Sequence, residues 1–209
     1  RIDNKYPQYT VFSLWDTYRA THPLFTIIDQ KRTNAFIKTF LRQFKEGKDL
    51  PVWELAGNET ECMIGFHSAS VIADAYVKGI RDYNAEEALS AMVYTSNLNE
   101  YGKTLFRDYG LISSDWESES VSKSLEYAYD HWCIGQMAKA MGAHIVGMST
   151  ALEAIAARQS GLEVLGLSLS TNLAAGISNS PLSHKEVLEA GKEAEPRISA
   201  LLAAIVAKL

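Results

Sequence analysis

The sequence has no aromatic residue after Trp132: none of its 7 Phe, 10 Tyr and 4 Trp residues lies in the last part of the chain. Aromatic side chains supply much of the buried area of a protein core wherever they occur. A single core built from the whole chain would draw on them throughout. Their absence from residues 133–209 therefore argues against one evenly built core and predicts a change of architecture near residue 133.

The sequence also has few cysteines. Its two thiols, Cys62 and Cys133, are too few for a disulfide framework, and the simplest interpretation is two buried thiols. A metal site that combined them with His67 and His131 is the alternative, but these spacings fit no tight pair of ligands. The sequence therefore predicts no metal site of its own.

Long apolar runs and an excess of basic residues are missing as well. No run approaches the roughly 20 residues that span a bilayer, and residues 1–4 have no apolar signal core. The net charge of −5 and the 47% of hydrophobic residues are ordinary for a globular protein and give no basic face for nucleic acid. We expect neither a membrane nor a nucleic acid as partner. The first residue is not Met, which leaves a start inside a longer chain open.

Residues 1–140 show the periodicity of helices joined by loops. Apolar residues recur at intervals of three and four, and glycines follow several of these segments. Only residues 9–14 alternate as a strand would. The longest predicted helix carries its apolar residues at Val121, Leu125, Ala128, Tyr129, Trp132, Ile134 and Met137. The predicted helices are 33–44, 64–80, 85–94, 101–109 and 118–140.

The pattern changes at residues 139–143, which we call the junction. Residues 143–147 and 162–169 are short apolar runs typical of buried strands, and a helix is predicted over 151–158 between them. Ser183 begins another helix, with Glu186 in the capping-box position, and residues 198–209 form an amphipathic helix. This order predicts a parallel α/β segment over 141–209 after an all-α part over 1–140.

Two clusters in the first part carry candidate chemistry. The sequences FSLWDT (12–17) and LPVWELAGNETECMIG (50–65) each place a Trp beside a carboxylate, Trp15 with Asp16 and Trp53 with Glu54. A pyranose presents an apolar CH face and several hydroxyl groups, so this pairing is typical of a sugar site. A core Trp beside a helix-capping carboxylate is the alternative.

Residues 8–140 resemble glycoside hydrolase family 92, the calcium-dependent exo-acting α-mannosidases. The resemblance rests on both clusters and continues through GFH (65–67), VIADAY (71–76), ESVSKSLEYAYD (119–130) and WCI (132–134). It implies part of an (α/α)6 barrel. It also implies that Asp16 and Trp15 lie at the mannose-binding subsite. Glu54, Asn58 and Glu59 would lie on a loop at the mouth of the barrel.

The sequence departs from that family in its catalytic segments. Inversion at a glycosidic centre needs a carboxylic acid and a carboxylate base about 6.5–9.5 Å apart. The resemblance implies an acid in a later Glu-Gly-Asn segment and a base in a still later Gly-Asn-Asp-Asp segment, and neither segment occurs here. The implied calcium ligands would also come largely from the missing part, so no cofactor site is complete.

The second part places polar groups where an α/β fold would bind a ligand. Ser149, in GMST (147–150), opens a predicted helix, where free backbone N–H groups favour an anion. Thr171 and Asn172 follow the next predicted strand, at the end where such sheets bind ligands. A serine that caps only its own helix is the alternative for Ser149.

Residues 138–209 resemble the C-terminal third of trimeric purine nucleoside phosphorylase. The resemblance rests on VGMST (146–150), IAAR (155–158), VLG (164–166), TNLAAGIS (171–178), PLSH (181–184) and EVLEAGK (186–192). It implies that Ser149 contacts phosphate and Met148 packs on the ribose. Asn172 would stabilise the charge on the leaving purine at N7, beside Thr171, and His184 would reach the ribose 5′-hydroxyl.

The phosphorylase resemblance is also incomplete, because the family's phosphate loop and purine-binding Glu would precede this segment. Three hypotheses follow: a mannosidase acting on mannosides, a phosphorylase acting on purine nucleosides and phosphate, and a composite chain without catalysis of its own. Each enzyme lacks catalytic parts, which favours the composite. Half a barrel leaves helix faces uncovered, so we also expect exposed apolar surface, with either oligomers formed through it or poor folding.

Overall fold

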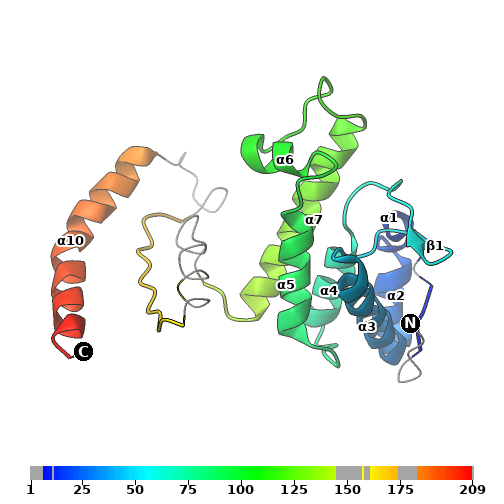
Figure 1. Cartoon of the computed structure of the whole chain (residues 1–209), viewed down its shortest axis with the longest axis horizontal. Helices are drawn as coiled ribbons and strands as arrows, with labels where there is room; N and C mark the ends of the chain where they lie inside the picture. Colours follow the sequence, from blue (N-terminus) through cyan, green and yellow to red (C-terminus); the bar gives the residue numbers. More distant parts are fainter. Residues whose placement is uncertain (1–6, 11, 145–156, 158–160, 174–182, 209) are drawn as a thin grey trace. The chain divides into compact units, whose positions relative to one another are not determined.

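The computed structural model describes residues 7–10, 12–144, 157, 161–173 and 183–208 of the 209-residue chain (Figure 1). The chain divides into two compact units, Arg1–Ala143 and His144–Leu209. No helix in the described part of the chain is long and apolar enough to cross a membrane.

The first unit is mostly helical, which confirms the helical character predicted for residues 1–140 (Figure 1). Its arrangement as part of an (α/α)6 barrel stays a prediction. A small antiparallel hairpin interrupts the helices and pairs Glu54 with Glu59 and Leu55 with Asn58. The elements are α1 (Leu14–Thr17), α2 (Thr21–Ile28), α3 (Gln30–Gly47), β1 (Glu54–Leu55), β2 (Asn58–Glu59), α4 (Ser68–Val77), α5 (Ala85–Ser96), α6 (Lys103–Tyr109) and α7 (Ser120–Ala140).

Local capping residues decide where these helices begin and end. The Asp29 carboxylate accepts a hydrogen bond from the Arg32 N–H at 3.0 Å, so α3 begins before the first periodic apolar residue. Asn84 caps α5 in the same way through the Glu87 N–H, also at 3.0 Å. Gly102 and Gly110 adopt left-handed conformations at the two ends of α6. Each predicted helix of the first unit is present, and these caps explain why its observed ends differ from the predicted ends by a few residues.

Helix α4 lies at the centre of the first unit. It packs against α2, α3, α5 and α7, and its small residues Ala69, Ala73 and Ala75 let the neighbouring helices approach closely. Phe40 from α3, Met92 from α5 and other apolar side chains close the core around it. The largest fully buried apolar side chains are Leu14, Ile37, Phe40, Leu50, Phe66, Ile72, Met92 and Met137.

Helix α7 contacts this core with a face that is partly polar. Tyr127, Cys133 and Met137 are buried together with Lys123 and Asp130. Four of the apolar residues that predicted the helix, Val121, Leu125, Tyr129 and Trp132, are instead exposed. The periodicity therefore identified the helix correctly, but much of its apolar stripe faces away from the core.

The strand predicted over residues 9–14 was wrong. In the described part of this segment the chain is irregular until Leu14, where α1 begins. Tyr9 and Phe12 both pack edge-on against Phe36, at centroid distances of 5.1 and 6.1 Å. Residues three apart face opposite sides of a strand, so this shared contact fits the irregular conformation and not a strand.

The second unit contains α10 (His184–Val206), which begins at the predicted cap: Ser183 Oγ accepts from the Glu186 N–H at 3.3 Å (Figure 1). The helix continues through Pro196, so residues 198–206 extend it and do not form a separate helix. Residues 162–169 are exposed and form no strand, and neither do Ala143 and His144. An apolar run becomes a strand only beside a partner strand. Residues 145–147, and the helix predicted over 151–158 apart from Ala157, lie outside the described residues.

Candidate functional site

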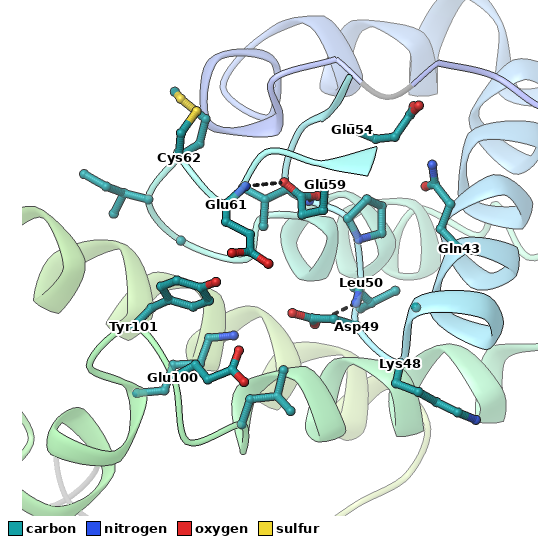
Figure 2. Close-up of a pocket in the computed structure, with 18 of the residues that line it drawn as sticks. Gln43, Lys48, Asp49, Leu50, Glu54, Glu59, Glu61, Cys62, Glu100 and Tyr101 are labelled. Atoms are coloured by element: carbon teal, nitrogen blue, oxygen red, sulfur yellow. Dashed lines mark hydrogen bonds between the residues drawn. The ribbon is translucent and has the colours of Figure 1, made fainter. Parts of the chain in front are cut away.

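A cleft of about 650 Å³ opens on the first unit (Figure 2). The loop between α3 and α4, which carries the β-hairpin, forms one wall, and the loop between α5 and α6 forms another. The end of α3 and the start of α7 complete it. The lining combines apolar residues with many polar ones, among them Asp49, Glu54, Asn58, Glu59, Glu61, Glu100, Tyr101, Lys103, Glu119 and Lys123.

The Glu59 carboxylate organises the loop that carries it. It accepts hydrogen bonds from the backbone N–H groups of Val52 (2.8 Å), Trp53 (3.1 Å), Thr60 (2.9 Å) and Glu61 (3.2 Å). Figure 2 shows the bond from Glu61. A carboxylate bound by several N–H groups holds a loop firmly, because these are charge-assisted bonds. Glu59 therefore shapes the cleft wall from within.

The structure brings three of the predicted sugar-site residues together at this cleft. Glu54 lies on β1, Asn58 and Glu59 lie on β2, and all three line the cleft. Glu54 Oε1 accepts from the Gly57 N–H at 2.7 Å, which closes the tight turn between the strands. Asn58 is exposed on β2.

Trp15 and Asp16 lie on α1 and do not line this cleft. The Leu14 N–H donates to the Val52 carbonyl at 2.9 Å, which ties α1 to the base of the hairpin loop. The Arg19 guanidinium covers the Trp15 ring, 5.1 Å from its centroid. A backbone hydrogen bond therefore joins the two predicted clusters, whereas the side chains of Trp15 and Asp16 lie outside the cleft that Glu54 lines.

Buried charges line the floor of the cleft. Burial raises the pKa of Asp49, and the Lys103 ammonium opposes that rise. Burial lowers the pKa of Lys103, and Asp49 opposes that fall. Lys103 Nζ donates to the Thr95 carbonyl at 3.0 Å and lies 5.3 Å from the centre of the Phe66 ring. The cleft lining therefore contains one acidic and one basic group, each of which opposes the effect of burial on the pKa of the other.

The hydroxyl of Tyr101 faces the same cleft. Burial raises its pKa, and a hydrogen bond with the Glu61 carboxylate raises it further. Figure 2 shows these two groups pointing toward one another across the cleft. Because carboxylates outnumber the ammonium groups in the lining, the cleft suits an uncharged ligand with many hydroxyl groups better than it suits an anion.

A second polar cluster lies beneath α1 and was not found from the sequence. His67 Nδ1 lies 2.9 Å from Asp130 Oδ1, and His67 Nε2 lies 3.4 Å from Glu126 Oε2. Tyr18 donates to Glu126 at 2.9 Å and stacks on the His67 ring at 4.0 Å. Arg19 pairs with Glu126 at 2.8 Å. Residues this distant in sequence leave no spacing signal, although His67 and Asp130 both belong to segments that carried the family resemblance.

The thiols and the donor groups do not converge on a metal. Cys133 is buried as predicted, but Cys62 is exposed on the cleft loop, so the prediction of two buried thiols was wrong for Cys62. The hydrogen bonds that Glu59 accepts fix the loop conformation, and in this conformation the Cys62 side chain is exposed. No group of three or more His, Cys, Asp and Glu residues in the described part of the chain could hold a metal ion. Calcium, which prefers six to eight oxygen ligands, stays an expectation of the family resemblance.

The predicted nucleoside-binding residues belong to the second unit. Thr171 and Asn172 are half-buried in an irregular segment, and His184 is the exposed first residue of α10. Met148 and Ser149 lie outside the described residues. The roles of all five stay predictions.

Comparison with known proteins supports both resemblances. The model of the glycosyl hydrolase family 92 catalytic domain matches residues 1–155, and that of the phosphorylase superfamily matches residues 125–207. The two matches share residues 125–155, which contain most of α7 and the junction.

Solved structures and curated proteins agree with these matches. A family GH92 α-mannosidase from Bacteroides thetaiotaomicron, solved with mannoimidazole, is 43% identical, has a TM-score of 0.65, and aligns with 68% of this chain and 19% of its own. A GH92 inverting mannosidase from the same species is 33% identical, with a TM-score of 0.61, over 65% of this chain and 19% of its own.

The purine nucleoside phosphorylase of a Cellulomonas species is 73% identical over 70 residues, 34% of this chain and 25% of that protein. That of Mycobacterium tuberculosis is 58% identical over 73 residues, 35% of this chain and 27% of that protein. The chain spans about a quarter of the length of these curated relatives and about a fifth of the solved mannosidases. Since the family 92 model matches well over half of the residues and the described fold agrees, the chain belongs to glycosyl hydrolase family 92, with a C-terminal part similar to the phosphorylase superfamily.

Proposed function

We propose that the chain is a composite whose first unit binds an α-mannoside in the hairpin cleft, and that it neither hydrolyses mannosides nor cleaves nucleosides on its own. In this proposal residues 1–140 are the mannosidase-like piece and residues 141–209 the phosphorylase-like piece. The convergence of Glu54, Asn58 and Glu59 on one cleft carries the binding part of the proposal. The division of the chain near residue 143 supports the assignment of the two pieces.

The chemistry of the cleft supports binding without turnover. Glycoside hydrolysis needs one carboxylic acid at the leaving oxygen and one carboxylate that activates water. The two carboxylate oxygens of Glu59 accept hydrogen bonds from four backbone N–H groups, and Glu54 accepts one from the Gly57 N–H. These bonds serve the conformation of the loop. The segments that the family resemblance implies for the acid and the base do not occur in the sequence.

Binding is tested by calorimetric titration of the whole chain with an α-1,2-mannobioside. We expect Asn58→Ala and Glu54→Gln each to weaken binding several-fold, since each removes a polar group that lines the cleft. Asp82→Asn is the control, because Asp82 is exposed and pairs with Lys38 outside the cleft. Equal affinity for all four proteins, or no binding by the unaltered chain, contradicts the binding proposal.

Catalysis is tested by two assays on the same preparation. Mannobioside with calcium is monitored for mannose, and inosine with phosphate is monitored for hypoxanthine; we expect no product in either. Mannose release that a calcium chelator stops would establish a mannosidase. Phosphate-dependent release of hypoxanthine would establish a phosphorylase, with Asn172, Thr171 and His184 as the first residues to change.

A further inference from the structure

The outer face of α7 is apolar and exposed. Val121 is 72% exposed, Leu125 68% and Trp132 59%, and Tyr129 lies beside them. The opposite face of the same helix packs on α4 and is buried through Tyr127, Cys133 and Met137. A helix at the surface of a complete protein normally presents polar residues on its outer side. Helix α7 is instead apolar on two sides, only one of which is covered within the first unit.

The exposed face has the spacing of a coiled-coil seam. Its residues follow one another at intervals of four, three, four, three and four, the repeat that keeps one stripe facing a partner helix. From Val121 to Gly135, about 21 Å at 1.5 Å per residue, the exposed side chains carry no charge. The seam, as we call it from here on, consists of Val121, Leu125, Ala128, Trp132, Gly135 and Lys139.

We propose that this seam is the contact surface between two copies of the chain, with their α7 helices antiparallel. The part of the seam from Val121 to Gly135 is uncharged, so it can pair with a second copy without burying an unpaired charge. A second copy supplies a matching apolar face and needs no other component. This inference does not depend on the proposed function.

Charges at the ends of α7 decide the direction. Exposed carboxylates of Asp115 and Glu119 lie at the start of the helix, and the exposed Lys139 lies at its end. Antiparallel pairing brings each lysine near the acidic end of the other copy, whereas parallel pairing brings carboxylates together. The helix dipoles favour the antiparallel direction as well.

Side-chain size fits the same arrangement. In an antiparallel pair with its two-fold axis near Asp130, Trp132 of one copy lies opposite Ala128 of the other. Leu125 then lies opposite Gly135, and Val121 opposite the aliphatic stem of Lys139. Each large side chain meets a small or flexible one, as knobs-into-holes packing requires. Two-fold symmetry repeats every contact, which gives a closed dimer.

The test is sedimentation velocity on the full chain over a range of concentrations. We expect the mass to rise from 23.1 kDa to twice that value with concentration. Leu125→Lys places a charge in the seam and should raise the dissociation constant at least tenfold. Ile27→Lys is the matched control, because Ile27 is 77% exposed on α2 and lies outside the seam; its dissociation constant should equal that of the unaltered chain. Circular dichroism verifies that both variants fold, since both altered side chains are exposed.

Charge reversal tests the direction. Lys139→Glu and Glu119→Lys should each weaken association several-fold, and the double variant should recover most of the affinity. Double variants that stay as weak as the singles overturn the antiparallel arrangement. A mass of one chain at every concentration overturns the proposal, and so does a Leu125→Lys variant that associates like the control.

Discussion

The imidazole of His67 and the carboxylate of Asp130 form a fully buried pair, with 2.9 Å between Nδ1 and Oδ1. The other carboxylate oxygen accepts from the Phe66 N–H at 2.8 Å. Burial raises the pKa of Asp130, and the hydrogen bond from His67 opposes that rise. The pair joins the middle of α7 to the start of α4, the two helices with the most extensive mutual packing in the first unit.

Removing the Asp130 carboxylate should destabilise the first unit strongly. Asp130→Ala leaves a buried imidazole and the Phe66 N–H without their acceptor, which costs about 3–5 kcal/mol for a broken buried pair. Asp82→Ala is the control, because it breaks an exposed ion pair with Lys38 and should cost less than about 1 kcal/mol. Urea denaturation of the two variants measures both free energies, and equal losses would show that the buried pair adds no stability.

Two glycines with the same backbone angle should respond differently to alanine. Gly57 and Gly65 both have φ of +84°, but a Cβ at Gly57 meets open space, whereas one at Gly65 collides with the His67 ring. Gly57→Ala should cost only the left-handed strain, about 1–2 kcal/mol. Gly65→Ala should cost roughly 3–5 kcal/mol, since it adds a collision inside the core. Similar denaturation midpoints for the two variants would rule out this crowding.

Acid should destabilise the first unit through His22. Burial lowers the pKa of His22 to about 4 from its ordinary 6.5, and its ring packs edge-on against Phe36 and Phe40. Between these two values the unfolded chain binds a proton that the folded chain does not. Stability is therefore lost as the pH falls from 6.5 to 4, by about 3 kcal/mol in all.

The matching variant for this titration is His22→Phe, which fits an aromatic neighbourhood and cannot titrate. Denaturation curves at pH 7, 5.5 and 4 should show a shallower loss of stability for His22→Phe than for the unaltered chain. Parallel losses would mean that other groups, and not His22, control the acid response.

Neutralising Glu59 should loosen the hairpin loop without unfolding the unit. Glu59→Gln exchanges one acceptor oxygen for an NH₂ donor, so at least one of the four backbone bonds must be lost. Hydrogen exchange at Val52, Trp53, Thr60 and Glu61 should become roughly tenfold faster, which corresponds to about 1.4 kcal/mol of local stability. Glu46→Gln, an exposed carboxylate on α3, should leave these rates unchanged, and equal rates in both variants would contradict the role of Glu59.

The sequence predicted the helices of the first unit because their periodicity is local, and the ends moved because capping side chains such as Asp29 lie outside the periodic segment. Helices α1 and α2 escaped prediction, since a four-residue helix and one with Pro23 in its first turn carry little periodic signal. Periodicity also cannot say which face of α7 is buried. That choice depends on what packs against the helix, and in the described part of the first unit α4, α5 and α6 do so.

Three of the predicted sugar-site residues, Glu54, Asn58 and Glu59, line one cleft because they form one continuous segment. Their role in binding stays a prediction. The four hydrogen bonds that Glu59 accepts within its own loop depend on the backbone conformation of that loop, which residue types alone do not predict. The pair of His67 and Asp130 joins residues 63 positions apart, so only the fold brings it together.

The end of α7 closes on its own residues at the junction. The amides of Met141, Gly142 and Ala143 bond to the carbonyls of Met137, Lys139 and Ala138, at 2.9, 3.0 and 3.0 Å, and Gly142 takes a φ of +101°. This Schellman-type ending satisfies the last turn with residues up to 143 alone. The carbonyls of Met137, Ala138 and Lys139 therefore need no partner from the sequence after residue 143. A different polypeptide could follow this ending without removing these bonds, so the end of α7 does not depend on the identity of the second unit.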